Sequence, residues 1–139
     1  LGLETLPDLD TMLGTSDIIS LHVPSAADTK GLVNATFLEK LQPGTIIINA
    51  SRGDVIDEEA LLSAMSDKGI RAGLDVYADE PASGEGEFSS ALARHPNTCG
   101  THHIGASTDQ AQTAVAEGVL EVINAFADGT VLHCVNGQG

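Results

Sequence analysis

The sequence predicts an α/β fold with a parallel sheet of the Rossmann type and flanking helices. The first observation is that expected strands and helices alternate: segments with helical signals separate the first three apolar runs of the chain. The second is the run Ile46-Ile47-Ile48, whose unbroken β-branched residues are typical of a strand buried in a parallel sheet. The expected strands span residues 17–23, 45–50, 70–77 and, less clearly, 98–104.

Capping residues define the helices between these strands. Asn34 is a suitable first residue for a helix that Pro43-Gly44 then ends, and Asp57 begins a second helix that Lys68-Gly69 closes. The expected helices span residues 7–14, 34–41 and 57–68.

The last third of the chain divides into a loop and a long helix. The segment from Tyr77 to Asn97 is rich in proline, glycine and acidic residues, so we expect a loop with at most a short helix at Ser89–Ala93. Ser107 and Gln110 have the spacing of a capping box, and apolar residues then repeat every three or four positions until near Gly129. This helix either packs on its own sheet or runs to another domain.

Composition excludes several classes of function. Twenty acidic residues against six basic ones give a formal net charge of -14, which opposes binding to nucleic acids and anionic membranes. No apolar run is long enough to span a bilayer, and residues 1–20 lack the pattern of a signal peptide, so we expect the cytoplasm. Cys99 and Cys134 have no metal-ligand spacing, so buried or partly buried thiols are expected.

Three polar residues follow strand ends and could do chemistry together. Arg52 can hold a carboxylate in bidentate fashion, although an arginine here could equally form a surface salt bridge. His103 can give and take a proton, and Glu80 can fix its tautomer. Since the carboxyl ends of parallel strands share one edge, these groups together suit the reduction of a 2-oxo acid.

Four motifs, in order, cover nearly the whole chain: Ser16 to Pro24, Leu41 to Gly53, Gly73 to Pro81, and His103 to Thr108. In this order they resemble the D-isomer-specific 2-hydroxyacid dehydrogenases. The last motif, with Ala111-Gln112 and the closing Val135-Asn136, is most similar to the branch that oxidises 3-phosphoglycerate for serine biosynthesis. Glyoxylate or hydroxypyruvate reduction, or a non-catalytic NAD-binding module like a corepressor, are the alternatives.

The resemblance implies a role for each candidate residue. Arg52 would hold the substrate carboxylate, His103 would be the acid/base and Glu80 its partner. NAD would be the cofactor, and a small 2-hydroxy or 2-oxo acid the substrate. The residues expected at the nicotinamide end are Val23, Pro24, Ala50, Ser51, Arg52, Asp75, His103, Gly105 and Ala106.

One departure from the family pattern, and one alternative use of the histidines, affect these expectations. The family usually has proline before the catalytic histidine, but here His102 stands there and adds a second imidazole. A zinc site of His22, His102 and His103 lacks a cysteine or carboxylate at ligand spacing, so no metal is expected.

The domain organisation follows from an absent motif. No Gly-x-Gly-x-x-Gly turn occurs in the 139 residues, and that turn binds the pyrophosphate in dinucleotide-binding folds. We therefore expect residues 1–106 to be the second half of an NAD-binding domain, and residues 107–139 a connecting helix that returns toward a substrate domain. Such a chain would be inactive alone, whereas the full-length enzyme would be a homo-oligomer, either a dimer or a tetramer. NAD and NADP are not distinguished.

Overall fold

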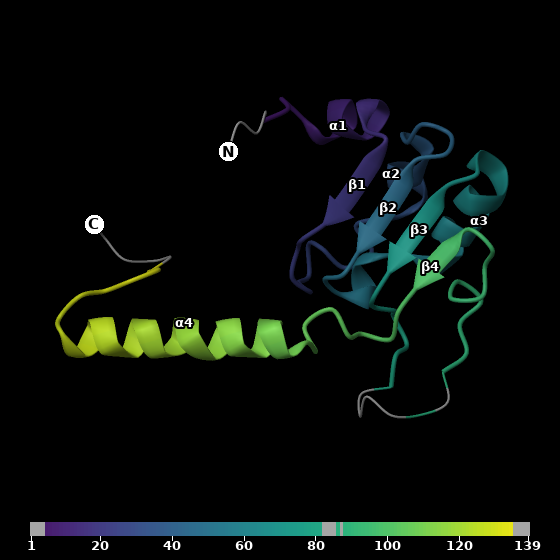
Figure 1. The fold of residues 1–139 in the computed structure, drawn as a ribbon. Coiled ribbons are helices and arrows are strands. Elements are labelled where there is room, and N and C mark those ends of the chain that lie inside the picture. Colours follow the sequence, from purple (N-terminus) through teal and green to yellow (C-terminus); the bar gives the residue numbers. More distant parts are fainter. Residues whose placement is uncertain (1–4, 82–85, 87, 135–139) are drawn as a thin grey trace. The chain divides into compact units, whose positions relative to one another are not determined.

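The computed structural model describes residues 5–81, 86 and 88–134, and the chain divides into two units, Leu1–His103 and Ile104–Gly139. The expected boundary lay three residues later, and the roles assigned to the two parts stay predictions. The elements of the first unit are α1 (Leu9–Thr15), β1 (Ile18–Leu21), α2 (Ala35–Glu39), β2 (Ile46–Asn49), η1 (Gly53–Val55), α3 (Glu58–Lys68), β3 (Arg71–Leu74) and β4 (Thr98–Gly100) (Figure 1).

The first unit is built on one sheet of four parallel strands in the order β1-β2-β3-β4. Ile19 pairs with Ile47, which pairs with Ala72, which pairs with Thr98. This confirms the predicted α/β fold and all four strands. Each strand is shorter than the apolar run that predicted it, because the flanking residues of each run lie in turns and loops.

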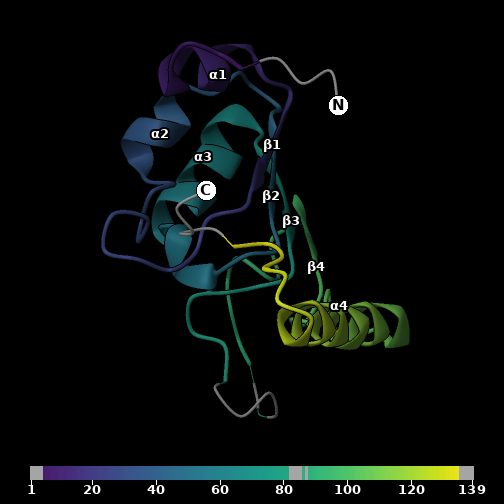
Figure 2. The same ribbon diagram turned by 90° about the vertical axis from the view of Figure 1, so that its left-hand side faces the viewer.

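Helices α1, α2 and α3 all lie on one face of this sheet (Figure 2). The strand side chains that point to that face are buried, for example Ile47 at 0% exposure and Leu74 at 3%. Ile18 and Ile48, on the other face, are 58% and 39% exposed. The sequence predicted that β2 is buried in the sheet, and this holds for the side chains on one of its two faces only. The largest fully buried apolar side chains are Leu13, Val33, Ile47, Val55, Leu61, Met65, Ile70 and Leu92.

The predicted caps of α2 and α3 are confirmed. The side-chain oxygens of Asn34 and Asp57 accept hydrogen bonds from the N–H groups of Phe37 at 3.1 Å and Ala60 at 3.0 Å. Lys68 Nζ donates to the carbonyl oxygens of residues 38, 39 and 41 at 2.6–3.1 Å, and so satisfies acceptors at the end of α2. Local sequence signals thus set where both helices begin.

The segment between β3 and β4 is a loop among its described residues, as predicted. Residues 91–94 form a turn where the sequence allowed at most a short helix at Ser89–Ala93. Residues 82–85 and 87 of this loop lie outside the described residues.

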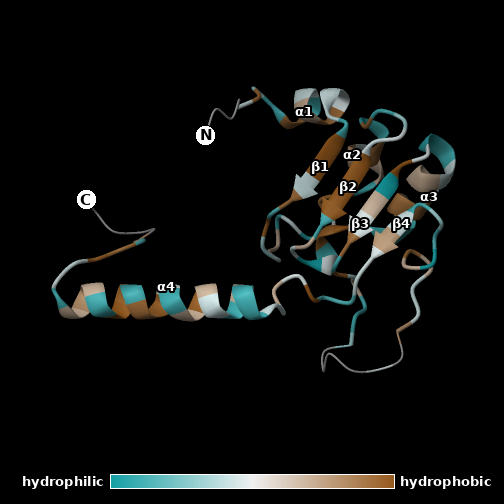
Figure 3. Ribbon diagram, viewed as in Figure 1, coloured by the Kyte–Doolittle hydropathy of each residue, from teal (hydrophilic) through white to brown (hydrophobic). Residues whose placement is uncertain are grey.

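The second unit consists of the single long helix α4 (Asp109–Ala127) and the segment after it. Thr108 caps α4 through a 3.1 Å bond from the Ala111 N–H, one residue later than the expected cap at Ser107. Hydrophobic residues recur along the whole helix (Figure 3), and none of its residues is buried. Val135 and Asn136 lie outside the described residues, and the two readings of this helix stay open.

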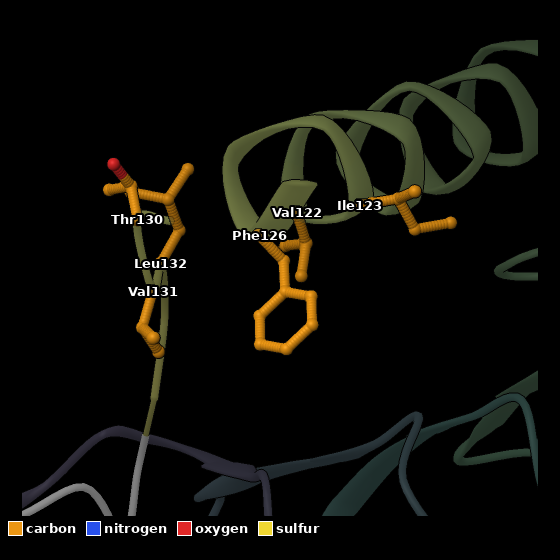
Figure 4. A pocket seen from close by; sticks show the side chains of 6 residues that line it. All are labelled: Val122, Ile123, Phe126, Thr130, Val131 and Leu132. Atoms are coloured by element: carbon orange, nitrogen blue, oxygen red, sulfur yellow. The ribbon is translucent and has the colours of Figure 1, made fainter. Parts of the chain in front are cut away.

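The end of α4 and the segment after it enclose a small apolar pocket. Its volume is about 220 Å³, and Figure 4 shows the side chains that line it, from Val122, Ile123, Phe126, Thr130, Val131 and Leu132. Searched over the residues that the structure places, no helix is long and apolar enough to cross a membrane.

Candidate active site

The candidate residues of the first unit follow the carboxyl ends of its strands. Val23 follows β1, Arg52 follows β2, Asp75 follows β3 and His103 follows β4. Because the four strands are parallel, these ends share one edge of the sheet. Val23 and Asp75 are half-buried, whereas Arg52 and His103 are exposed, so this edge combines apolar and charged groups that a ligand can reach.

Asn49, the last residue of β2, organises the loop that carries Arg52. Its side chain is fully buried, and its Nδ2 donates to the Arg52 carbonyl at 2.8 Å. Its Oδ1 accepts from the Ser51 N–H at 3.0 Å and the Ser51 hydroxyl at 2.8 Å. A buried amide with these bonds fixes the turn, since breaking one would leave a polar group unsatisfied. Sequence reasoning missed this role, although an asparagine inside an isoleucine run was a visible signal.

Gly53 brings the Arg52 loop against the loop that carries Glu80. A Cβ atom at position 53 would overlap the Tyr77 carbonyl group and would lie 2.6 Å from the Ala78 nitrogen, so only glycine fits. Glu58 Oε1 accepts a hydrogen bond from that same Ala78 N–H at 2.9 Å. The backbone that leads to Glu80 is therefore held from two sides.

Glu80 and His103, 23 residues apart in sequence, form the central pair of the site. His103 Nδ1 lies 2.7 Å from Glu80 Oε1, and the two side chains are 50% and 32% exposed. A carboxylate only accepts hydrogen bonds, so Nδ1 carries the proton that is shared with Glu80. In the neutral ring, Nε2 then has a free lone pair that can take a proton from a substrate.

The backbone of His103 has an uncommon conformation. Its φ of 61° lies in the left-handed region, which costs a residue with a side chain on the order of 1 kcal/mol or more. Such strain persists where the surroundings hold it, and it is concentrated at functional sites. The backbone conformation and the contact with Glu80 are separate observations, and both indicate that His103 is a functional residue.

Asp75 lies at the end of β3 and is tied to its neighbours. Its Oδ1 accepts from the Thr101 hydroxyl at 2.5 Å, and its N–H donates to the Asn49 carbonyl at 3.0 Å. A carboxylate has acceptor sites for several donors, so Asp75 can also accept from an amide or a hydroxyl of a ligand.

Tyr77 lies behind the site and is 6% exposed. Burial raises the pKa of its hydroxyl, and the nearby Glu58, Asp75 and Cys99 raise it further. The phenol is therefore neutral at physiological pH.

Several other residues lie where the sequence did not predict them. Cys99 and Cys134 are exposed, so the expectation of buried or partly buried thiols is wrong. The sequence suggested that His22 lies either in the core or beside the cofactor; it is exposed, 2.8 Å from the Ser20 hydroxyl, which excludes the core and leaves the second alternative a prediction. Gly105 belongs to the second unit with Ala106, whose carbonyl accepts from a glutamine, and stays a predicted cofactor contact. Within the part of the chain that is described, no three His, Cys, Asp or Glu side chains are placed to hold a metal ion.

Comparison with known proteins gives the family. Residues 1–105 match the family described as D-isomer specific 2-hydroxyacid dehydrogenase, NAD binding domain. The chain belongs to this family. It is 47% identical over 120 residues, 86% of its length, to a D-3-phosphoglycerate dehydrogenase of Synechocystis.

Two solved dehydrogenase structures resemble the chain in fold. One is a D-lactate dehydrogenase of Aquifex aeolicus, complexed with NAD and lactic acid, with a TM-score of 0.68, 33% identity and 87% of this chain covered. The other is a glyoxylate reductase of Paecilomyes thermophila, with a TM-score of 0.75, 32% identity and 92% covered. The chain spans 21% of the length of the Synechocystis relative, and 40% and 38% of these two structures.

Residues 1–105 thus match the NAD-binding domain of this dehydrogenase family, and the strand ends of the first unit suit the nicotinamide end of the cofactor. Ala50 is small and exposed, so it leaves the sheet edge open to a flat ring. Val23 offers an apolar contact beside it, and Asp75 offers acceptor oxygens for a carboxamide or a ribose hydroxyl. These groups fit the cofactor that the family binds.

Proposed function

We propose that the full-length protein oxidises a D-2-hydroxy acid to the 2-oxo acid with NAD, and that Arg52, Glu80 and His103 are its catalytic residues. The 2.7 Å contact between His103 Nδ1 and Glu80 Oε1 carries the proposal, because it leaves Nε2 as the base. The 2-hydroxy acid loses a proton from its hydroxyl oxygen and a hydride from C2. The proton goes to His103 Nε2, and Glu80 stabilises the imidazolium that forms.

NAD, when held at this edge of the sheet, would supply the acceptor for the hydride that leaves C2. Val23, Pro24, Ala50, Ser51, Arg52, Asp75, His103, Gly105 and Ala106 are the residues that we propose to hold its nicotinamide end. Arg52 would hold the substrate carboxylate through two parallel N–H bonds and so orient C2 and its hydroxyl. Running the steps in reverse reduces the 2-oxo acid, with the imidazolium as the proton donor.

The substrate that we favour is 3-phosphoglycerate, oxidised to 3-phosphohydroxypyruvate. The 47% identity to a D-3-phosphoglycerate dehydrogenase supports it. The resemblance in fold to a glyoxylate reductase supports glyoxylate or hydroxypyruvate as the second candidate. The cytoplasmic location and the dimer or tetramer stay predictions.

A substrate panel with the full-length protein tests this proposal. We expect the highest kcat/KM with 3-phosphoglycerate, compared with glycerate, glycolate and lactate. A preference for glyoxylate or hydroxypyruvate would select the second candidate. NAD binding without turnover of any 2-hydroxy acid would contradict an enzyme and favour a non-catalytic binding module.

Replacing Arg52 tests its role as the carboxylate anchor. We expect Arg52→Ala to lower kcat/KM by about a hundredfold and to weaken NAD binding far less, because the guanidinium would hold the substrate carboxylate while the cofactor keeps its other contacts. Arg71→Ala is the matched control, since Arg71 is an exposed arginine at the opposite end of a strand in the same sheet. Equal, small losses in both variants would contradict the anchor role.

A further inference from the structure

Tyr77 connects the two loops that carry the Glu80–His103 pair. It lies three residues before Glu80, just beyond the end of β3, and it is 6% exposed. Its ring packs on Phe88, with the ring centres 5.1 Å apart and the planes at 52°. The side chain therefore belongs to the core of the first unit although it lies next to the site.

The hydroxyl of Tyr77 occupies the space where a side chain at position 100 would lie. A Cβ atom on Gly100, the last residue of β4, would overlap the Tyr77 hydroxyl oxygen. The same Cβ would lie 3.4 Å from Tyr77 Cζ and 3.7 Å from the Leu74 carbonyl, which are distances that need little adjustment. The obstruction is thus confined to one oxygen atom, and Gly100 lies three residues before His103.

The tyrosine has little room to move away from Gly100. The Tyr77 carbonyl group lies against Gly53, where a Cβ would also overlap, and the next N–H donates to Glu58 at 2.9 Å. Phe88 supports the ring itself. A displacement of the hydroxyl would therefore move either the strand end that leads to His103 or the backbone that leads to Glu80.

We propose that Tyr77 is a positioning residue for the acid/base pair, and that its hydroxyl against Gly100 sets the spacing between Glu80 and His103. This inference rests on the proposed function and goes beyond it. Tyr77 and Gly100 are a complementary pair, in which the large residue on one loop requires the small one on the other. A 2.7 Å hydrogen bond has little tolerance, so a displacement near 1 Å would break it.

A double-mutant cycle in the full-length protein tests this inference, with Tyr77→Phe, Gly100→Ala and both changes together. We expect Gly100→Ala to lower kcat about tenfold or more, and Tyr77→Phe to lower it by a smaller factor. The double variant should be closer to the parent than Gly100→Ala, because the new methyl group takes the place of the lost hydroxyl. KM should change much less than kcat, since the contact lies between the acid/base loops.

Gly73→Ala on β3 is the matched control. A Cβ there would meet Ile48 Cγ1 at 3.8 Å, which is ordinary contact, so this variant should keep the parent kcat. A second readout is independent of turnover: the ¹⁵N shifts of the His103 ring report whether Nδ1 carries the proton that Glu80 accepts. The proton on Nδ1 should be lost or averaged in Gly100→Ala and recovered in the double variant. Thermal melting would show that each protein is folded.

The two readouts distinguish failure of this inference from failure of the proposed function. The positioning role would be overturned if Gly100→Ala lowered kcat by the same factor with and without Tyr77→Phe. It would also be overturned if the ¹⁵N shifts of the His103 ring were the same in all four proteins. If the ring signals follow the cycle while no protein, the parent included, turns over a 2-hydroxy acid, then the positioning role stands and the proposed function fails.

Discussion

Helices α3 and α4 differ in how far the rest of their own unit buries their apolar side chains. Leu61 and Met65 of α3 are 0% and 2% exposed, packed in the core beneath the sheet. Val119 and Phe126 of α4 are 52% and 72% exposed. Both helices have a side-chain cap at the N-terminus, so the difference lies in packing and not in local sequence signals.

This contrast teaches where the stability of the site comes from. The first unit completes a hydrophobic core, and the loops that carry Arg52, Glu80 and His103 extend from strands anchored in that core. Most helical stability in proteins comes from packing of an apolar face. Among the described residues of the second unit, that face packs against the segment after the helix, at the pocket near Phe126 (Figure 4).

The largest expected effect comes from truncating one apolar side chain in each helix. In the 139-residue chain, Leu61→Ala should lower the free energy of unfolding by about 2–5 kcal/mol, because it leaves a cavity. Val119→Ala should lower it by about 0.5 kcal/mol or less, since that side chain is half-exposed. Urea denaturation measures both. Similar losses would show that α4 shares the core of the first unit and would remove the contrast.

A smaller effect is expected from the helix caps, because the cap of α1 in the first unit should depend on pH and the cap of α4 in the second unit should not. The hydrogen bonds from the Thr11 N–H and hydroxyl lower the pKa of Asp8, the cap of α1, below its usual 3.8. Its contribution to stability is therefore present above pH 3.8 and is lost as the pH falls through the lower pKa of the folded state. Asp8→Ala should reduce the melting temperature slightly at pH 7, and the difference from the parent should disappear in acid.

Thr108→Ala in α4 is the matched cap, because a hydroxyl does not titrate. It should reduce the helix content of residues 109–127 equally at pH 7 and in acid, as NMR chemical shifts would show. An acid-sensitive effect at Thr108, or an acid-insensitive one at Asp8, would contradict the assigned caps.

The sequence predicted the elements well because their signals are local. Apolar runs gave the four strands, and side-chain acceptors at Asn34 and Asp57 gave the starts of α2 and α3. The loop predicted between β3 and β4 contains a turn at residues 91–94, in which Ser90 Oγ accepts from the Ala93 N–H.

The candidate site was predicted less completely, because its geometry depends on distant contacts. The motif order gave Arg52, Glu80 and His103, and their catalytic roles stay predictions. It could not give the fit of Gly53 and Gly100 against Tyr77, since these contacts join segments 23 or more residues apart. It could not give the bonds of Asn49 either, because they depend on the burial of its side chain. An isolated glycine in a strand or loop was the available signal, and it was not interpreted.

The central claim is that His103, held by Glu80, moves the proton. The most direct test is kcat for His103→Gln in the full-length protein, with His102→Gln as the matched control, since it removes the neighbouring exposed imidazole. We predict a loss of about a thousandfold in His103→Gln, with His102→Gln close to the parent. Retained activity in His103→Gln with a large loss in His102→Gln would contradict the account and assign the proton to His102.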